Sequence, residues 1–75
     1  MIRTYNIDIL SDLLGTTPNI VHSHYSGMSL EKIKEDLKGF VSYETEKEIN
    51  VLADAIFHIV NLGHYTYKYD ADELE

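Results

Sequence analysis

The chain has 75 residues, no cysteine and a formal net charge of -7. This length predicts one small domain spanning residues 1–75, with a modest hydrophobic core. The absence of cysteine excludes a disulfide framework, a thiolate metal site and a cysteine nucleophile. The apolar runs are too short to cross a bilayer, and the first residues lack the apolar core of a signal peptide. We therefore expect a cytoplasmic protein with no membrane partner.

The negative charge is concentrated in the second half of the chain. Residues 1–43 carry a net charge of -1, whereas residues 44–75 carry eight carboxylates against two lysines, a net charge of -6. An excess of this sign repels phosphate backbones and attracts basic protein surfaces. Solubility alone would account for the same excess, so the charge by itself does not choose a function.

The first elements are an extended segment and a short helix. Met1 to Tyr5 contains residue types that favour a strand. Asn6 is suited to be the N-cap of a helix that ends at Leu14, and Gly15 is suited to the left-handed residue that follows it. The apolar positions of this helix fall at helical spacing: Ile7, Ile9, Leu10, Leu13 and Leu14.

Two further short helices follow. Thr17 and Pro18 are typical of an N-cap and a first helical position, and this second helix ends before Gly27. Ser29 is the next N-cap, for a third helix over residues 30–38 that Gly39 ends. Its apolar residues lie at helical spacing, at Leu30, Ile33 and Leu37.

The fourth predicted helix is the longest and the most apolar. Thr45 and Glu48 form a capping box at its start, although Ser42 could begin the helix one turn earlier. The helix runs to about Leu62, just before Gly63. Its apolar stripe is wide, so we expect it to be the central packing element of the core. The stripe comprises Ile49, Leu52, Ala53, Ile56, Phe57, Ile59 and Val60.

After Gly63 the pattern changes to a period of two. Tyrosines alternate with other residues over residues 64–69, which predicts a strand. A single strand is unstable alone, and Met1 to Tyr5 is the candidate partner within the chain. The sequence therefore predicts a mainly α fold: four helices, with a helix, turn and helix near the N-terminus, and a short C-terminal strand paired with residues 1–5.

One local pattern resembles a known family. A small residue, a glycine four positions later and an aliphatic residue six positions further on occur as Ser11, Gly15 and Val21, with Leu10 and Leu14 beside the small residue. The small residue allows close helix packing, the glycine permits the turn, and the aliphatic residue packs the second helix onto the first. With the segment LLGTTPNIV, this pattern resembles the helix-turn-helix domains of phage and bacterial regulators.

The resemblance implies a small regulator of phage or mobile-element type, expected to be dimeric, whose second helix contacts the target. The candidate DNA-binding residues are Thr16, Thr17, Asn19, His22, Ser23 and Ser26. Asparagine can pair with adenine, and hydroxyl side chains are adaptable. None of the six is lysine or arginine, although phosphate contacts normally supply much of the affinity. Geometry thus favours DNA and charge opposes it, and a helix-turn-helix that binds a protein is the competing interpretation.

The second hypothesis is an acidic inhibitor that mimics nucleic acid, such as a phage anti-defence protein, and blocks a host nucleic-acid-binding enzyme. Tyrosine is favoured in interfaces, and carboxylates suit a basic partner. The same tyrosines could instead pack on the core, or the strand could pair with its copy in a homodimer. The candidate protein-binding residues are Glu44, Glu46, Glu48, Tyr65, Tyr67, Tyr69, Asp70, Asp72 and Glu73.

Catalytic and metal sites are weighed and not predicted. His22 and His24 lie about 200° apart on a helix, so they cannot chelate one ion together. Joining His24 to His58 or His64 would require the fold to bring them together. Asp54 and His58 are four residues apart, which is more typical of an ordinary helix pair than of an acid–base pair. We therefore expect no enzyme, no metal and no cofactor.

Overall fold

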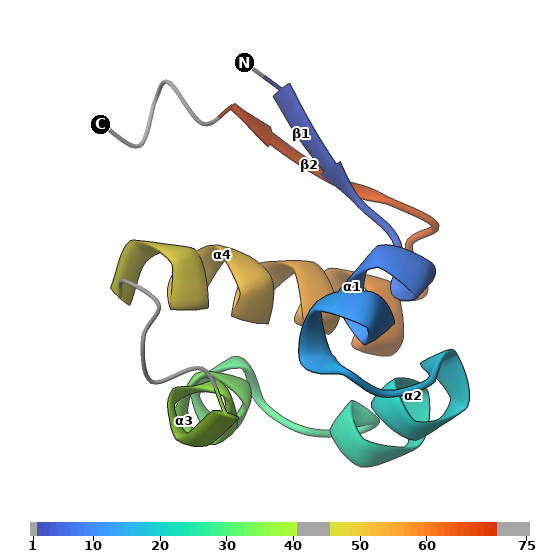
Figure 1. Cartoon of the computed structure of the whole chain (residues 1–75), viewed down its shortest axis with the longest axis vertical. Coiled ribbons are helices and arrows are strands. Elements are labelled where there is room, and N and C mark those ends of the chain that lie inside the picture. The colour runs from blue at the N-terminus through green and yellow to red at the C-terminus, as the bar shows by residue number, and fades with distance from the viewer. Residues whose placement is uncertain (1, 41–45, 71–75) are drawn as a thin grey trace.

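The structure is a computed structural model that describes residues 2–40 and 46–70. Over these residues the protein is mainly helical, with one short antiparallel ribbon, which confirms the predicted fold class (Figure 1). No helix in the described ranges is long and apolar enough to cross a bilayer. The elements in order are β1 (Ile2–Tyr5), α1 (Ile7–Leu14), α2 (Pro18–Tyr25), α3 (Leu30–Phe40), α4 (Glu46–Ile56), the π-helix η1 (Phe57–Asn61) and β2 (Tyr67–Asp70).

The α4–η1 segment is the central element, as its wide apolar stripe predicts. Figure 1 shows α3 on one side of α4 and the β1–β2 ribbon on the other, with α1 and α2 at the η1 end. The packing joins α3 and α1 to α4, and α2 to η1. The largest fully buried side chains come from four different helices: Leu10, Val21, Ile33, Leu37 and Ile56.

Local signals define α1 and α2 as the sequence predicts. The Asn6 side chain accepts a hydrogen bond from Ile9 N at 2.8 Å, and Gly15 takes the left-handed conformation at φ 69°. Thr17 caps α2, accepting from Ile20 N at 3.4 Å, and Pro18 follows as the first helical residue. These caps satisfy backbone groups that a short helix would otherwise leave without a partner.

The contacting helices α1 and α2 each bury a residue of the sequence pattern. Ser11 is buried, and its hydroxyl donates to the Ile7 carbonyl at 2.6 Å, so it needs no partner outside its own helix. Val21 is also buried and packs α2 into the core. Ser11 and Val21 are thus buried residues of the two helices that the three-residue turn joins, and these helices with their turn are called the α1–α2 unit below.

Two predicted helix boundaries are wrong. Gly39 does not end the third helix, which continues to Phe40; Gly39 keeps a helical backbone instead of turning left-handed, which is the change that ends a helix at glycine. The fourth helix is not α-helical to Leu62, because it widens into η1 after Ile56. Leu62 N donates to Phe57 O at 3.2 Å, five residues back. The predicted capping box lies partly outside the described residues, since Thr45 and Ser42 are not among them.

The widened turn presents Asn61 to the α2–α3 turn. Its amide nitrogen donates to the carbonyl oxygens of Tyr25 at 3.1 Å and Met28 at 3.2 Å. Its side-chain oxygen accepts from Gly27 N at 2.6 Å. A single side chain therefore holds the turn at which α2 gives way to α3.

The predicted pairing of the two ends of the chain is confirmed, but the second strand is shorter than predicted. β1 and β2 are antiparallel, with Ile2 opposite Asp70 and Tyr5 opposite Tyr67. The residues from His64 to Thr66 lie outside the strand. β1 has four residues and ends at Tyr5, which pairs with Tyr67. The residues just before Tyr67 therefore have no strand to pair with, although the alternating tyrosine pattern includes them.

Candidate functional site

The six residues proposed from the sequence for DNA binding lie on α2 and at its ends. Thr17, Asn19, His22, Ser23 and Ser26 are exposed, and Thr16 is half-buried. At 100° per residue, Asn19 and Ser23 lie on the side of α2 opposite the buried Val21 and Tyr25. The Thr17 hydroxyl is engaged as the N-cap of α2. The outermost side chains of α2 are thus short and uncharged.

No permanent positive charge lies on the α1–α2 unit. Residues 4–31 contain neither lysine nor arginine, while Asp8 and Asp12 are exposed on α1. The nearest basic residues along the chain are Arg3 on β1 and the lysines of α3: Lys32, Lys34 and Lys38. The exposed face of α2 is therefore neutral when its histidines are neutral, and its surroundings on α1 are acidic.

A carboxylate on α3 fixes the far end of α2. Asp36 Oδ2 accepts a hydrogen bond from the Tyr25 hydroxyl at 2.8 Å and lies 3.1 Å from His24 Nε2. Burial, and secondly the hydrogen bond and charge of Asp36, raise the pKa of the Tyr25 phenol well above its ordinary value. The phenol therefore stays a donor at neutral pH, and α2 stays joined to α3 at this point.

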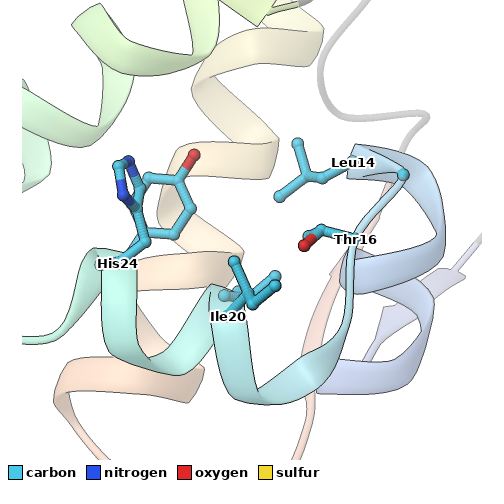
Figure 2. A pocket seen from close by; sticks show the side chains of 7 residues that line it. Leu14, Thr16, Ile20 and His24 are labelled. Carbon is cyan, nitrogen blue, oxygen red and sulfur yellow. The ribbon is translucent and has the colours of Figure 1, made fainter.

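An open groove lies between the end of α1 and the side of α2. Its volume is about 310 Å³, and its walls are mainly apolar. Figure 2 shows Leu14 and Thr16 on one side, facing Ile20 and His24 across the opening. Its floor includes Val21 and Tyr25. Pockets of about this size, apolar with a few polar groups, are typical of binding sites.

Large apolar side chains are exposed around the α1–α2 unit. Leu13 is 54% exposed, Ile20 is 57% exposed and Ile9 is 40% exposed. Ile9 and Leu13 are one turn apart on the same flank of α1, and Ile20 lines the groove. Helical spacing predicts that Ile9 and Leu13 belong to the apolar stripe of the first helix, but it does not predict that their side chains remain in contact with water.

The residues proposed for an acidic protein-binding face are only partly described. Glu46 and Glu48 are exposed in the first turn of α4, and Asp70 ends β2. The remaining carboxylates of that set lie outside the described residues: Glu44, Asp72 and Glu73. The described members of this set therefore lie on two separate elements, α4 and β2.

The three C-terminal tyrosines have different surroundings. Tyr65 is 94% exposed and lies outside the strand. Tyr69 stacks on Tyr5 with ring centroids 5.9 Å apart, and Tyr67 donates to Asp54 Oδ2 at 3.4 Å. Tyr67 and Tyr69 pack against the core, so they serve the fold first, and Tyr65 alone among the three is largely surrounded by solvent.

The histidines do not form a metal site with other groups in the described ranges. His58 lies near His64, with ring centroids 5.5 Å apart, and near Tyr67, with centroids 5.1 Å apart. His58 Nδ1 is 2.8 Å from the backbone oxygen of Asp54, which is the bond of a side chain to its own helix and not a carboxylate–imidazole pair. This cluster packs η1 against β2.

Comparisons with known proteins give this chain no relative: no protein-family model, curated protein or solved structure matches it. The resemblance to helix-turn-helix regulators therefore rests on the residues of the α1–α2 unit alone. The candidate site consists of the exposed face of α2 and the groove beside it.

Proposed function

We propose that the protein is a small non-enzymatic binding protein, with the α1–α2 unit as a helix-turn-helix-like scaffold, that regulates a basic protein partner by contact. The observation that carries this proposal is the exposed face of α2, which has no lysine or arginine but is bordered by an apolar groove and by exposed Ile20. A DNA reader and a protein binder need opposite surfaces here.

Charge argues against DNA as the target. DNA-binding proteins gain much of their affinity from cations that replace the counterions of the phosphates, and backbone contacts outnumber base contacts. The α1–α2 unit supplies no such cation, and the whole chain carries -7. Asn19 and Ser23 could reach a base edge. The negative electrostatic field of the protein would, however, repel the DNA phosphate backbone, which the protein must approach first.

Exposed apolar surface supports a protein as the target. Interfaces combine an apolar centre with a polar rim, and contiguous exposed apolar patches on small proteins commonly mark binding sites. Ile20 and the groove supply the apolar centre, while Asn19, Ser23 and Thr16 supply the rim. The acidic excess favours a partner with a basic surface, and proteins that bind nucleic acids have such surfaces. Inhibition of such a partner, as in the acidic-inhibitor hypothesis, is the regulatory action that we infer.

A DNA mobility-shift assay with a salt series tests this proposal. We expect no shift of a random-sequence duplex pool, even at low salt. A shift whose logarithmic affinity falls linearly with the logarithm of salt concentration, and which Asn19→Ala abolishes, would overturn the proposal in favour of a DNA regulator. Thr4→Ala, on β1 and away from α2, is the matched control because it also removes an exposed polar side chain.

A photo-crosslinking experiment provides the positive arm. A photoreactive residue at Ser23, in the exposed face of α2, is compared with one at Thr66, which is exposed in the loop before β2. We expect Ser23 to yield a crosslink to a basic protein in the source cells, with a yield that falls as salt rises, and Thr66 to yield less. A crosslink to nucleic acid at Ser23 would contradict the proposal.

A further inference from the structure

We propose that His58 and His64 together bind a divalent transition-metal ion of the Zn²⁺ type through their imidazole nitrogens. His58 lies in η1, and His64 lies in the loop between η1 and β2. Neither residue lines the groove beside α2. The inference therefore concerns a second site and does not depend on the proposed function.

The end of the helix brings the two histidines together. On a continuous α-helix, residues six apart lie about 9 Å apart along the axis and about 120° apart around it. Here η1 ends at Asn61, and Gly63 takes the left-handed conformation at φ 72°. The backbone N–H of His64 then donates to the His58 carbonyl at 3.0 Å. This hydrogen bond holds one histidine to the other, in a π-helical turn of the kind that is frequent at functional sites.

The hydrogen bond of the His58 ring leaves one nitrogen available to a metal. His58 Nδ1 lies 2.8 Å from the backbone oxygen of Asp54, and a carbonyl oxygen can only accept. Nδ1 therefore carries the proton, and Nε2 of the neutral ring keeps its lone pair. Histidines that bind metals typically donate their other ring N–H to a carbonyl or a carboxylate in this way, which fixes the ring for the ion.

The separation of the two rings matches that of two ligands on one ion. Zinc–nitrogen bonds are about 2.0–2.1 Å long in tetrahedral sites, so the ring centres of two histidines on one ion lie roughly 5–6 Å apart. The ring centroids of His58 and His64 are 5.5 Å apart. A small adjustment of the His64 side chain, which is exposed, is enough to direct both nitrogens at the ion.

The surroundings of the pair favour a cation. The Tyr67 ring lies 5.1 Å from the His58 ring, and its hydroxyl donates to Asp54 Oδ2 at 3.4 Å, so a carboxylate belongs to the same cluster. The net charge of -7 adds attraction at longer range. The described residues hold no set of three histidine or carboxylate ligands, so water completes the coordination shell. Imidazole ligands suit Zn²⁺, Ni²⁺ and Cu²⁺, whereas Mg²⁺ prefers oxygen.

Titration calorimetry of the full chain with Zn²⁺ at neutral pH tests the inference. Mg²⁺ serves as the control ion. His58→Gln and His64→Gln each remove one ligand, and His24→Gln is the matched control on α2, where the side chain is 47% exposed. Circular dichroism checks the fold of each variant. His64→Gln decides if His58→Gln is unfolded, because His64 is exposed and its loss leaves the core intact.

We expect one Zn²⁺ per chain and no saturable binding of Mg²⁺ at the same concentration. His58→Gln and His64→Gln should each weaken zinc binding about tenfold or more, and His24→Gln by no more than about twofold, an order-of-magnitude expectation for the loss of a ligand. In the unaltered chain, nitrogen NMR of the imidazoles should show Zn²⁺ shifting the Nε2 signal of His58 while its Nδ1 stays protonated.

Three results would overturn the inference. The first is zinc binding that His64→Gln leaves unchanged. The second is a zinc-dependent shift of the His22 or His24 nitrogens as large as that of His58 and His64. The third is one ion for every two chains, which would mean that the ion bridges two copies of the protein instead of joining two histidines of one chain.

Discussion

The α3–α4 pair and the α1–α2 unit use their apolar residues differently. Among the described side chains of α3 and α4, no large hydrophobic residue is exposed, and Ile33, Leu37 and Ile56 are fully buried. The α1–α2 unit exposes Ile9, Leu13 and Ile20. The difference indicates that α3 and α4 supply most of the core, while α1 and α2 carry more apolar surface than the core uses. Surface of that kind is where binding partners are found.

Substituting one isoleucine in each region gives the largest expected contrast. Ile33→Ala removes a fully buried side chain between α3 and its neighbours and should lower the free energy of unfolding by about 2–5 kcal/mol. Ile20→Ala should lower it by no more than about 0.5 kcal/mol, because the side chain is mostly in water. Urea unfolding followed by circular dichroism measures both. Similar losses would mean that the α1–α2 unit is as much part of the core as α3.

The second contrast concerns Asn61, which joins the two regions at the α2–α3 turn. Asn61→Ala leaves Gly27 N and the Tyr25 and Met28 carbonyls without this partner, and should cost about 1–3 kcal/mol. Asn61→Asp should cost more, because a carboxylate places negative charge against two carbonyl oxygens that accepted from the amide. Thermal unfolding measures these losses.

Asn19 provides the control for Asn61. It is an exposed asparagine on α2, so Asn19→Asp and Asn19→Ala should change the free energy of unfolding by about 0.5 kcal/mol or less. If Asn61→Asp is no more destabilising than Asn19→Asp, the three hydrogen bonds do not hold the α2–α3 turn.

The ends of α1 and the start of α2 could be predicted from the sequence because their causes are local. Asn6 and Thr17 bond to backbone groups three residues away, and Gly15 follows the last helical residue directly. The role of Asn61 could not be predicted, because its partners lie 33 to 36 residues away. No local signal marks the change from α4 to η1, and the late start of β2 depends on the length of β1 in another part of the chain.

The candidate site was predictable only in part for the same reason. Helical spacing is enough to place Asn19 and Ser23 on the outer side of α2 once Val21 is assigned to the core. Helical spacing cannot tell whether Leu14 and Ile20 are covered, because that depends on where α3 and α4 pack. Leu14 and Ile20 were therefore apolar helix residues in the sequence and are groove walls in the structure.

One glycine in each region, when replaced by alanine, should change the free energy of unfolding with opposite sign. Gly15 ends α1 at φ 69°, so Gly15→Ala should cost about 1 kcal/mol through backbone strain, although an added Cβ meets no atom within 4 Å. Gly39 is helical within α3 and equally open, so Gly39→Ala should stabilise by about 0.5 kcal/mol. Chemical unfolding of the two variants measures both signs. Destabilisation by Gly39→Ala would show that α3 ends before this residue in solution.

The Tyr25–Asp36 hydrogen bond joins the α1–α2 unit to the α3–α4 pair. Its titration should have the smallest effect on stability at neutral pH and should change stability only at alkaline pH. Burial and Asp36 raise the pKa of Tyr25 in the folded state, whereas the pKa of an unfolded tyrosine is about 10. Below pH 10 both states keep the proton and the contact contributes fully. Above it the unfolded chain loses its proton first, so stability falls as pH rises towards the folded-state pKa.

Unfolding midpoints measured from pH 7 to 12 should therefore fall above about pH 10, and the fall should be shallower in Tyr25→Phe. Some of it should remain in that variant, because burial also raises the pKa of Tyr5 and Tyr67. Tyr65→Phe is the control, since Tyr65 is 94% exposed and should leave the profile unchanged. If Tyr25→Phe and Tyr65→Phe give the same profile, the phenol does not join α2 to α3. Packing and the hydrogen bond from Asn61 to the Tyr25 carbonyl then hold the groove floor.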